Sequence, residues 1–112
     1  MESRRILEVR TTVGDLEEAA ELIRQLVKKR LAACGQIMGP IRSIYRWQGR
    51  MEDENEWLCL LKTTADCYPA LEQEILQHHP YETPEILAVP VEFAAADYVE
   101  WLHTVVRSAA GE

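Results

Sequence analysis

The residues of this chain best suited to chemistry are two adjacent histidines, His78 and His79, with glutamates close behind them. Neutral imidazole and carboxylate oxygens together make mixed sites for Cu(II), Zn(II) or Ni(II). Neighbouring helical residues point about 100° apart, so one imidazole is expected to bind, with Glu85 or with Glu82. Two or three such ligands without a cysteine predict a weak, open metal site. The alternative is structural, because a histidine in a last helical turn interacts favourably with the helix dipole and Pro80 stops the helix.

A second group of candidate residues is aromatic, with one lysine. Trp47, Tyr45 and Trp57 lie in or beside strand-forming sequence. A tryptophan there could stack on a planar ligand, but we favour aromatic side chains that are buried at a subunit interface. Lys62 begins the sequence KTT after an apolar run. Its ammonium group either neutralises an anionic ligand or a carboxylate such as Glu85, or forms a salt bridge to a neighbouring strand.

Composition narrows the classes of function. The formal net charge of the 112 residues is −7 and the Lys and Arg residues are scattered, which argues against nucleic-acid binding. No apolar run is long enough for a signal peptide or a membrane span, so we expect no membrane association and a cytoplasmic location. The three cysteines show no C-x-x-C spacing and are expected in the core. The chain carries no recognised nucleophile signature and no P-loop, so it is not predicted to be an enzyme.

The pattern of the chain predicts one domain over residues 1–112, with the element order β-α-β-β-α-β-α. Asp15 and Glu18 resemble a capping box at the start of the first helix. Asp66 and Asp97 are expected to cap the second and third helices. The expected elements are strands at 6–13, 34–50, 56–64 and 85–93, helices at 16–31, 67–79 and 98–105, a kink at Gly39-Pro40, a bulge at Gly49 and a turn at 51–55.

Two split β-α-β units around a hairpin give an α+β ferredoxin-like sandwich, in which a four-stranded antiparallel sheet carries two helices on one face. The last helix is an addition at the C-terminal end. The other face of the sheet is left uncovered, although the strands are apolar at both parities and residues 57–61 have no polar side at all. An apolar sheet face of this kind is expected to be covered by another part of a protein. The simplest partner is another copy of the chain, so an oligomer is expected.

Five segments together resemble the CutA divalent-ion tolerance family, in order and at matching spacing. They are KRLAACGQI, IRSIYRWQGRMEDENE, LLKTT, HHPYETPEILAVPV and DYVEWL, and the resemblance runs over roughly residues 6–106. It implies a ferredoxin-like fold assembled as a trimer, with the long hairpin of one subunit pairing with a neighbour's sheet. It also implies an association with tolerance of copper and other divalent metals. Thr11 stands where copper-linked bacterial relatives often carry a cysteine, which is a softer ligand for Cu(I).

The expected function is that of a cytoplasmic homotrimer that binds Cu(II) or another divalent cation weakly, near the clefts between subunits, with no organic cofactor. His79 is expected to face such a cleft together with Tyr81 and Glu85. His78 is expected nearer solvent, because Pro80 forces the chain to turn at the helix end. The alternative is a trimeric sensor similar to the PII proteins, which hold a small molecule between subunits.

Overall fold

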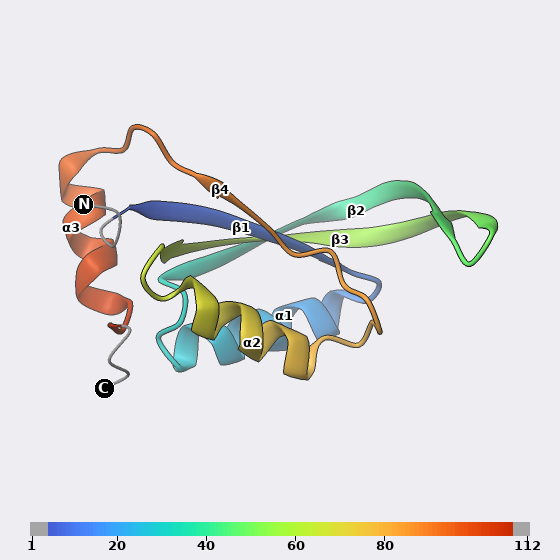
Figure 1. Cartoon of the computed structure of the whole chain (residues 1–112), viewed down its shortest axis with the longest axis horizontal. Helices are drawn as coiled ribbons and strands as arrows, with labels where there is room; N and C mark the ends of the chain where they lie inside the picture. Colours follow the sequence, from blue (N-terminus) through green and yellow to red (C-terminus); the bar gives the residue numbers. More distant parts are fainter. Residues whose placement is uncertain (1–4, 109–112) are drawn as a thin grey trace.

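The computed structural model describes residues 5–108, and its elements follow the expected order. They are β1 (Ile6–Val13), α1 (Leu16–Lys28), β2 (Cys34–Trp47), β3 (Arg50–Thr64), α2 (Tyr68–His78), β4 (Leu87–Pro90) and α3 (Ala96–Val105). The four strands form one antiparallel sheet in the order β2-β3-β1-β4. Helices α1 and α2 lie side by side on one face of the sheet (Figure 1). The predicted α+β ferredoxin-like sandwich with an added C-terminal helix is therefore confirmed.

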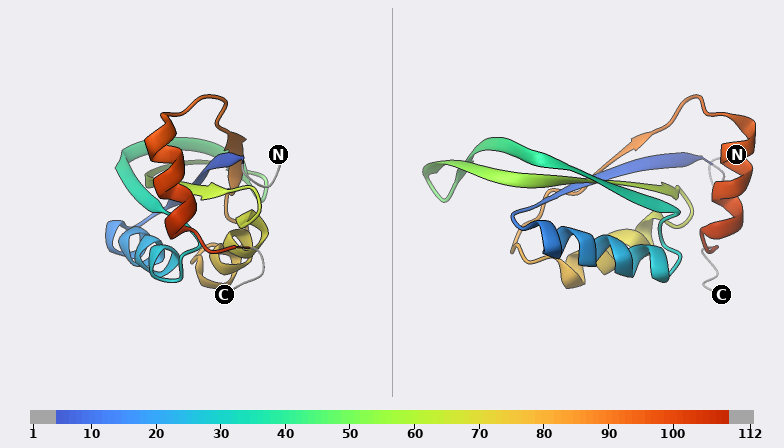
Figure 2. Two further views of the ribbon diagram at one scale, coloured as in Figure 1. Left: turned by 90° about the vertical axis from the view of Figure 1, so that its left-hand side faces the viewer. Right: turned by 180° about the vertical axis from the view of Figure 1, so that it is seen from behind.

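The hydrophobic core lies between the sheet and helices α1 and α2. Successive side chains of a strand point to opposite faces, so every second residue of β1 and β3 packs on the helices. Residues with no exposed surface include Val9, Val13, Leu26, Leu61, Leu71 and Ile75. Cys59 and Cys67 are buried as predicted, whereas Cys34 is only half-buried. Burial raises the pKa of the Cys59 thiol to about 11. Helix α3 lies at the end of the sheet away from the hairpin and buries Leu102 (Figure 2).

Helix α1 begins where the sequence predicts it. Asp15 is the N-cap residue, and its carboxylate accepts a hydrogen bond of 3.0 Å from the backbone N–H of Glu18. The helix then packs closely on β2 at Gly35, where a Cβ atom would lie 2.5 Å from Ile23 Cγ2. A residue without a side chain thus sets the short distance between α1 and the sheet.

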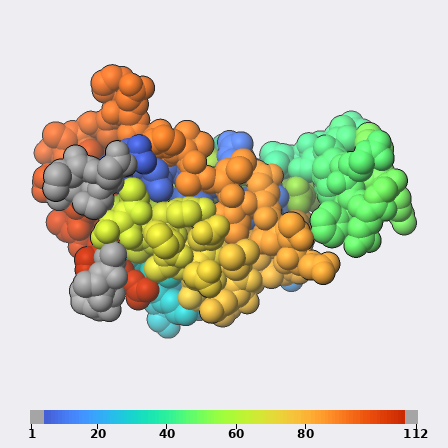
Figure 3. Space-filling view, viewed as in Figure 1, coloured from blue at the N-terminus to red at the C-terminus, as the bar shows by residue number. Residues whose placement is uncertain are grey.

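Strands β2 and β3 form a hairpin that extends beyond the rest of the molecule (Figure 1). With the hairpin, the molecule measures 43 × 27 × 23 Å. The two strands have 14 and 15 residues, and their register shifts between Met38 and Ile41, at the cis peptide bond Gly39-Pro40. We call residues 41–55, which lie beyond this shift, the arm. No residue of the arm is buried within one chain. In the space-filling view the arm stands clear of the body (Figure 3).

The turn of the hairpin differs from the prediction. The turn is made by Gln48 and Gly49, with φ of 51° and 79°, and Met51 to Asn55 are paired strand residues instead of a turn. Positive φ at both central positions is the pattern of a type I′ turn, which matches the twist of the flanking strands. The polar run was misread as a loop because the arm has no core beneath it, so its strands carry no regular apolar alternation.

Other predictions about element ends were also wrong, and the first helix, expected over 16–31, ends at Lys28. The N-cap of α2 is Cys67, without a side-chain cap, and that of α3 is Ala95, with Asp97 inside the first turn. The last strand covers Leu87–Pro90 only and pairs with Leu7–Arg10 of β1. The ladder begins at Leu87, opposite Arg10, and a further backbone hydrogen bond of 2.9 Å from the Val91 N–H to the Ile6 oxygen follows Pro90. The outer edge of β1 beyond Arg10 is therefore left for other groups to cover.

Candidate functional site at the end of helix α2

His79 covers the part of the β1 edge that β4 leaves open. Helix α2 ends at His78, and the backbone of His79 is extended, with φ −71° and ψ 138°. Its side chain is turned inward and only 8% exposed. Its Nε2 atom lies 2.9 Å from the backbone oxygen of Thr12, and its Nδ1 accepts a hydrogen bond of 3.1 Å from the backbone N–H of Tyr81.

These two contacts fix the protonation of the His79 ring. A carbonyl oxygen only accepts and an amide N–H only donates, so Nε2 carries the hydrogen and Nδ1 is bare. Burial lowers the pKa of His79. The hydrogen bond to the Thr12 carbonyl and the carboxylates of Glu56 and Glu18 raise this pKa, but by less than burial lowers it. A second proton on Nδ1 would also break the bond from Tyr81, so the neutral ring is the form that this site holds.

Tyr81 extends the same network to the base of the arm. Its hydroxyl donates a hydrogen bond of 2.6 Å to Oε2 of Glu56, a residue that is only 5% exposed. The tyrosine and His79 rings lie 4.9 Å apart. Burial and then the bond to Glu56 raise the pKa of Tyr81 well above its usual range. The hydroxyl passes Gly14, where a Cβ atom would lie 3.1 Å from it.

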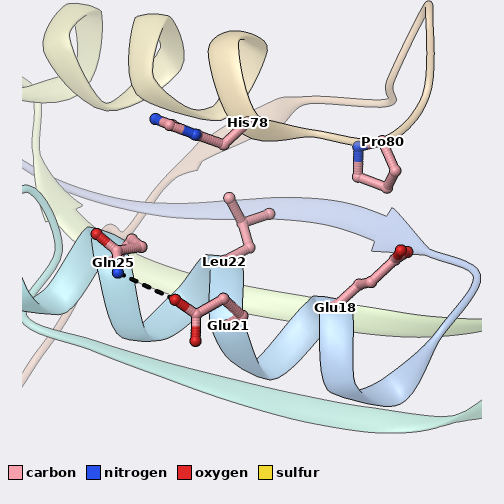
Figure 4. Close-up of a pocket in the computed structure, with 6 residues that line it drawn as sticks. All are labelled: Glu18, Glu21, Leu22, Gln25, His78 and Pro80. Atoms are coloured by element: carbon pink, nitrogen blue, oxygen red, sulfur yellow. Dashed lines mark hydrogen bonds between the residues drawn. The ribbon is translucent and has the colours of Figure 1, made fainter.

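His78 lies outside this network. Its side chain is 50% exposed, and its Nε2 is 3.0 Å from Oε2 of Glu74, which also pairs with Lys29 of α1. Beside it, a cavity of about 340 Å³ opens between α1 and α2. The cavity is lined by Glu18, Glu21, Leu22, Gln25, His78 and Pro80 (Figure 4). The predicted position of His78 nearer solvent agrees with this geometry.

The structure does not bring the predicted metal ligands, including Glu82, together in one chain. Glu85 is exposed, His78 pairs with Glu74, and both ring nitrogens of His79 are engaged. Within residues 5–108 no group of three or more His, Cys, Asp or Glu side chains is placed to hold a metal ion. Binding at His79 would require one of its ring hydrogen bonds to open, so a metal site there stays a prediction.

Thr11 offers no ready replacement for a cysteine ligand. It is fully buried, and its hydroxyl has no hydrogen-bond partner among the residues that the structure describes. By strand alternation it shares the helix-covered face of β1 with Val9 and Val13. A metal ion in contact with this hydroxyl would have to enter the hydrophobic core.

The aromatic candidates and Lys62 are divided between the arm and the sheet. Tyr45 and Trp47 are exposed on the arm, whereas Trp57 is half-buried and packs against the core. The Trp57 ring fills the space over Gly39, where a Cβ atom would lie 2.7 Å from it. The ammonium group of Lys62 is 3.6 Å from a carboxylate oxygen of Glu8 on β1, which is the neighbouring-strand salt bridge that the sequence left open as an alternative.

Two residues of this region were missed from the sequence. Glu56 follows the acidic run at 52–54 as the first residue of the expected strand 56–64, and Glu74 lies on a helix with another glutamate, Glu72. Neither their residue type nor their spacing in the sequence distinguishes these two glutamates from the other glutamates of the chain. Their partners, Tyr81 and Lys29, are 25 and 45 residues away in the chain, so only the folded structure identifies these contacts.

Relatives of this chain are found by sequence. The family model described as CutA1 divalent ion tolerance protein matches residues 7–105. The divalent-cation tolerance protein CutA of Thermus thermophilus is 42% identical over 91 residues, which are 81% of this chain and 88% of that protein. Protein CutA of Mus musculus is 42% identical over 90 residues, which are 80% of this chain and 51% of that protein. This chain thus spans about half the length of the Mus musculus relative.

Solved structures agree with this assignment. The divalent cation tolerance protein (Cut A1) of Thermus thermophilus superposes with a TM-score of 0.88 at 38% identity, covering 91% of this chain and 99% of that one. CutA of Archaeoglobus fulgidus, described as a periplasmic divalent cation tolerance protein, reaches a TM-score of 0.88 at 31% identity, covering 91% and 99%. The family model and these identities establish that the chain belongs to the CutA1 divalent ion tolerance family.

Proposed function

We propose that this protein acts as a homotrimer in the tolerance of divalent cations, and that it binds Cu(II) or a similar cation weakly. The observation that carries this proposal is the family match over residues 7–105. The role is one of binding, with no catalytic residue assigned. A cytoplasmic location is part of the proposal as an expectation from the sequence. No helix of the described residues 5–108 is long and apolar enough to cross a membrane.

The exposed apolar residues of the arm support assembly. Ile44 is 58% exposed and Met51 is 66% exposed, and Tyr45 and Trp47 lie on the same hairpin. Val89, on the outer strand of the sheet, is exposed as well. Apolar surface of this extent is uncommon on a monomer and favours contact with another subunit.

His78 and Glu74, whose side chains are 50% and 14% exposed, are one candidate pair of cation ligands in one chain, and Glu74 also pairs with Lys29. The imidazole is half exposed beside the α1–α2 cavity, where Glu18 and Glu21 add negative charge. His79 with Glu85 remains a second candidate pair, and the need to open a ring hydrogen bond would make binding there weaker. Either arrangement supports micromolar or weaker affinity.

Titration calorimetry with Cu(II) and with Zn(II), combined with native mass spectrometry, tests this proposal. We expect a trimer mass and weak binding in the wild type. A loss of affinity in His78→Ala alone assigns the ion to the cavity, and a loss in His79→Gln alone assigns it to the loop after α2. His103→Ala is the control for a histidine outside both places. A monomer mass, or equal ion uptake in all four proteins, would contradict the assembly or the assigned ligands.

Localisation is tested separately. Fractionation of cells that produce the full-length protein should recover it with cytoplasmic marker proteins. Recovery in the periplasm, the location given for the Archaeoglobus fulgidus relative, would overturn this part of the proposal.

A further inference from the structure

The arm leaves the body of the molecule at one defined position. Strand β1 pairs with β3 only as far as Val13 opposite Trp57. Counted from the body of the molecule toward the tip of the hairpin, Glu56 is therefore the first residue of β3 without a β1 partner. It lies opposite Ile41, the first β2 residue after the register shift. Beyond this point no residue of the arm is buried within one chain. The direction of the arm must therefore be set by contacts at its base.

Three consecutive residues after α2, 79–81, make such a contact. His79 is attached to the backbone of Thr12 near the end of β1, and the Tyr81 N–H is attached to the His79 ring. The Tyr81 hydroxyl then passes Gly14 and reaches Glu56. Three hydrogen bonds of 2.9, 3.1 and 2.6 Å thus connect the edge of β1, the loop and the base of the arm.

We propose that residues 79–81 form a strap that fixes the direction of the arm, with His79, Tyr81 and Glu56 as positioning residues. A buried carboxylate requires a hydrogen-bond donor, and a bond to a charged group contributes more than a neutral one. Without the Tyr81 hydroxyl, the Glu56 side chain moves toward water, and the base of the arm loosens with it. Displacement of the His79 ring from Thr12 has the same effect, because the ring also holds the backbone of Tyr81.

Because the strap fixes the direction of the arm, the loop after α2 also orients the surface through which subunits of the proposed trimer make contact. The proposed subunit contact lies on the arm, so an arm that points in many directions meets a neighbour less often in the right geometry. This consequence rests on the proposed trimer. The strap itself does not, because its bonds lie within one chain.

Hydrogen-exchange mass spectrometry of the full chain tests the strap. Tyr81→Phe removes one hydroxyl and keeps the ring that packs on His79. We expect amides of residues 41–55 to exchange about tenfold faster in this variant, while peptides from β1 and α1 keep the wild-type rate. Tyr98→Phe is the matched control, because its hydroxyl lies 3.7 Å from Cys34 Sγ at the α3 end of the molecule, away from the arm.

The possible results distinguish a failure of the proposed strap from a failure of the proposed trimer. Unchanged exchange of the arm in Tyr81→Phe, or an equal increase over the whole chain, overturns the strap. Faster exchange confined to the arm, in a sample that keeps the wild-type subunit mass, supports the strap. Light scattering on the same samples reports the trimer independently, and a monomeric wild type would contradict only the proposed assembly. Glu56→Gln, which still accepts from Tyr81, is expected to show a smaller change than Tyr81→Phe.

Discussion

At the scale of single residues, the inward turn of His79 makes the fold sensitive to acid. Burial lowers the pKa of this ring below its ordinary value of 6.5, so the unfolded chain binds a proton more readily than the folded one. This contribution to stability is complete above about pH 6.5 and is lost as the pH falls toward the lowered pKa. We expect the free energy of unfolding to decrease over this window in the wild type.

Urea unfolding between pH 5 and 8 measures the effect. His79→Gln supplies a donor and an acceptor without a titrating group, so its stability should depend less on pH in the same window. His78→Gln changes a half-exposed ring and should retain the acid sensitivity of the wild type. Equal pH dependence in wild type and His79→Gln would mean that another group is responsible.

A second residue-scale prediction concerns the distance between α1 and β2. Gly35→Ala places a methyl group 2.5 Å from Ile23 Cγ2, and something must move. Overpacking of this kind costs about 1–3 kcal/mol in the free energy of unfolding, measured by chemical denaturation. Combining Gly35→Ala with Ile23→Ala should recover part of this overpacking loss, measured against Ile23→Ala alone, because alanine lacks the Cγ1 and Cγ2 atoms that crowd the new methyl group. No recovery in the double variant would place the strain elsewhere.

At the scale of elements, the two-residue turn of the hairpin depends on positive φ. Gly49 has φ 79°, a value that costs alanine about 1 kcal/mol relative to glycine, so Gly49→Ala should lower the stability of the arm by about that amount. Gln48, with φ 51°, is replaced at little cost by asparagine, which tolerates this region better. Thermal unfolding of the two variants compares them. A more stable Gly49→Ala would contradict the turn type.

Elements with local signals were predictable from the sequence, and contacts between distant residues were not. Strand β1 and the start of α1 were placed correctly, because β-branched alternation and an Asp15 cap act locally. The end of α2 was also foreseen from Pro80. The inward position of the His79 ring depends on Thr12, which is 67 residues earlier in the chain, so no local pattern indicates it. The turn was misplaced because residues 52–55 of the arm are a polar run and no core lies beneath them.

At the scale of the whole molecule, the proposed trimer predicts the behaviour of arm variants. Ile44→Asp introduces a charge on an exposed apolar side chain of the arm, and the desolvation of that charge opposes subunit contact. Light scattering should give about three times the chain mass for the wild type and a lower mass for this variant. Val27→Asp makes the same type of change on α1, where the side chain is 37% exposed, and should keep the wild-type mass.

The absence of buried residues in the arm has a consequence for the thermodynamics of the protein. A segment that gains its buried surface only from a neighbour is stabilised by mass action, so its order depends on how many neighbours are in solution. If subunits provide that surface, the melting temperature should rise with protein concentration, and dilution should loosen the arm before it affects the sandwich. Calorimetry over a hundredfold range of concentration would show the shift, because that range corresponds to about 2.7 kcal/mol for one tight contact. In that case the ordering of the arm and the assembly of the subunits are a single equilibrium.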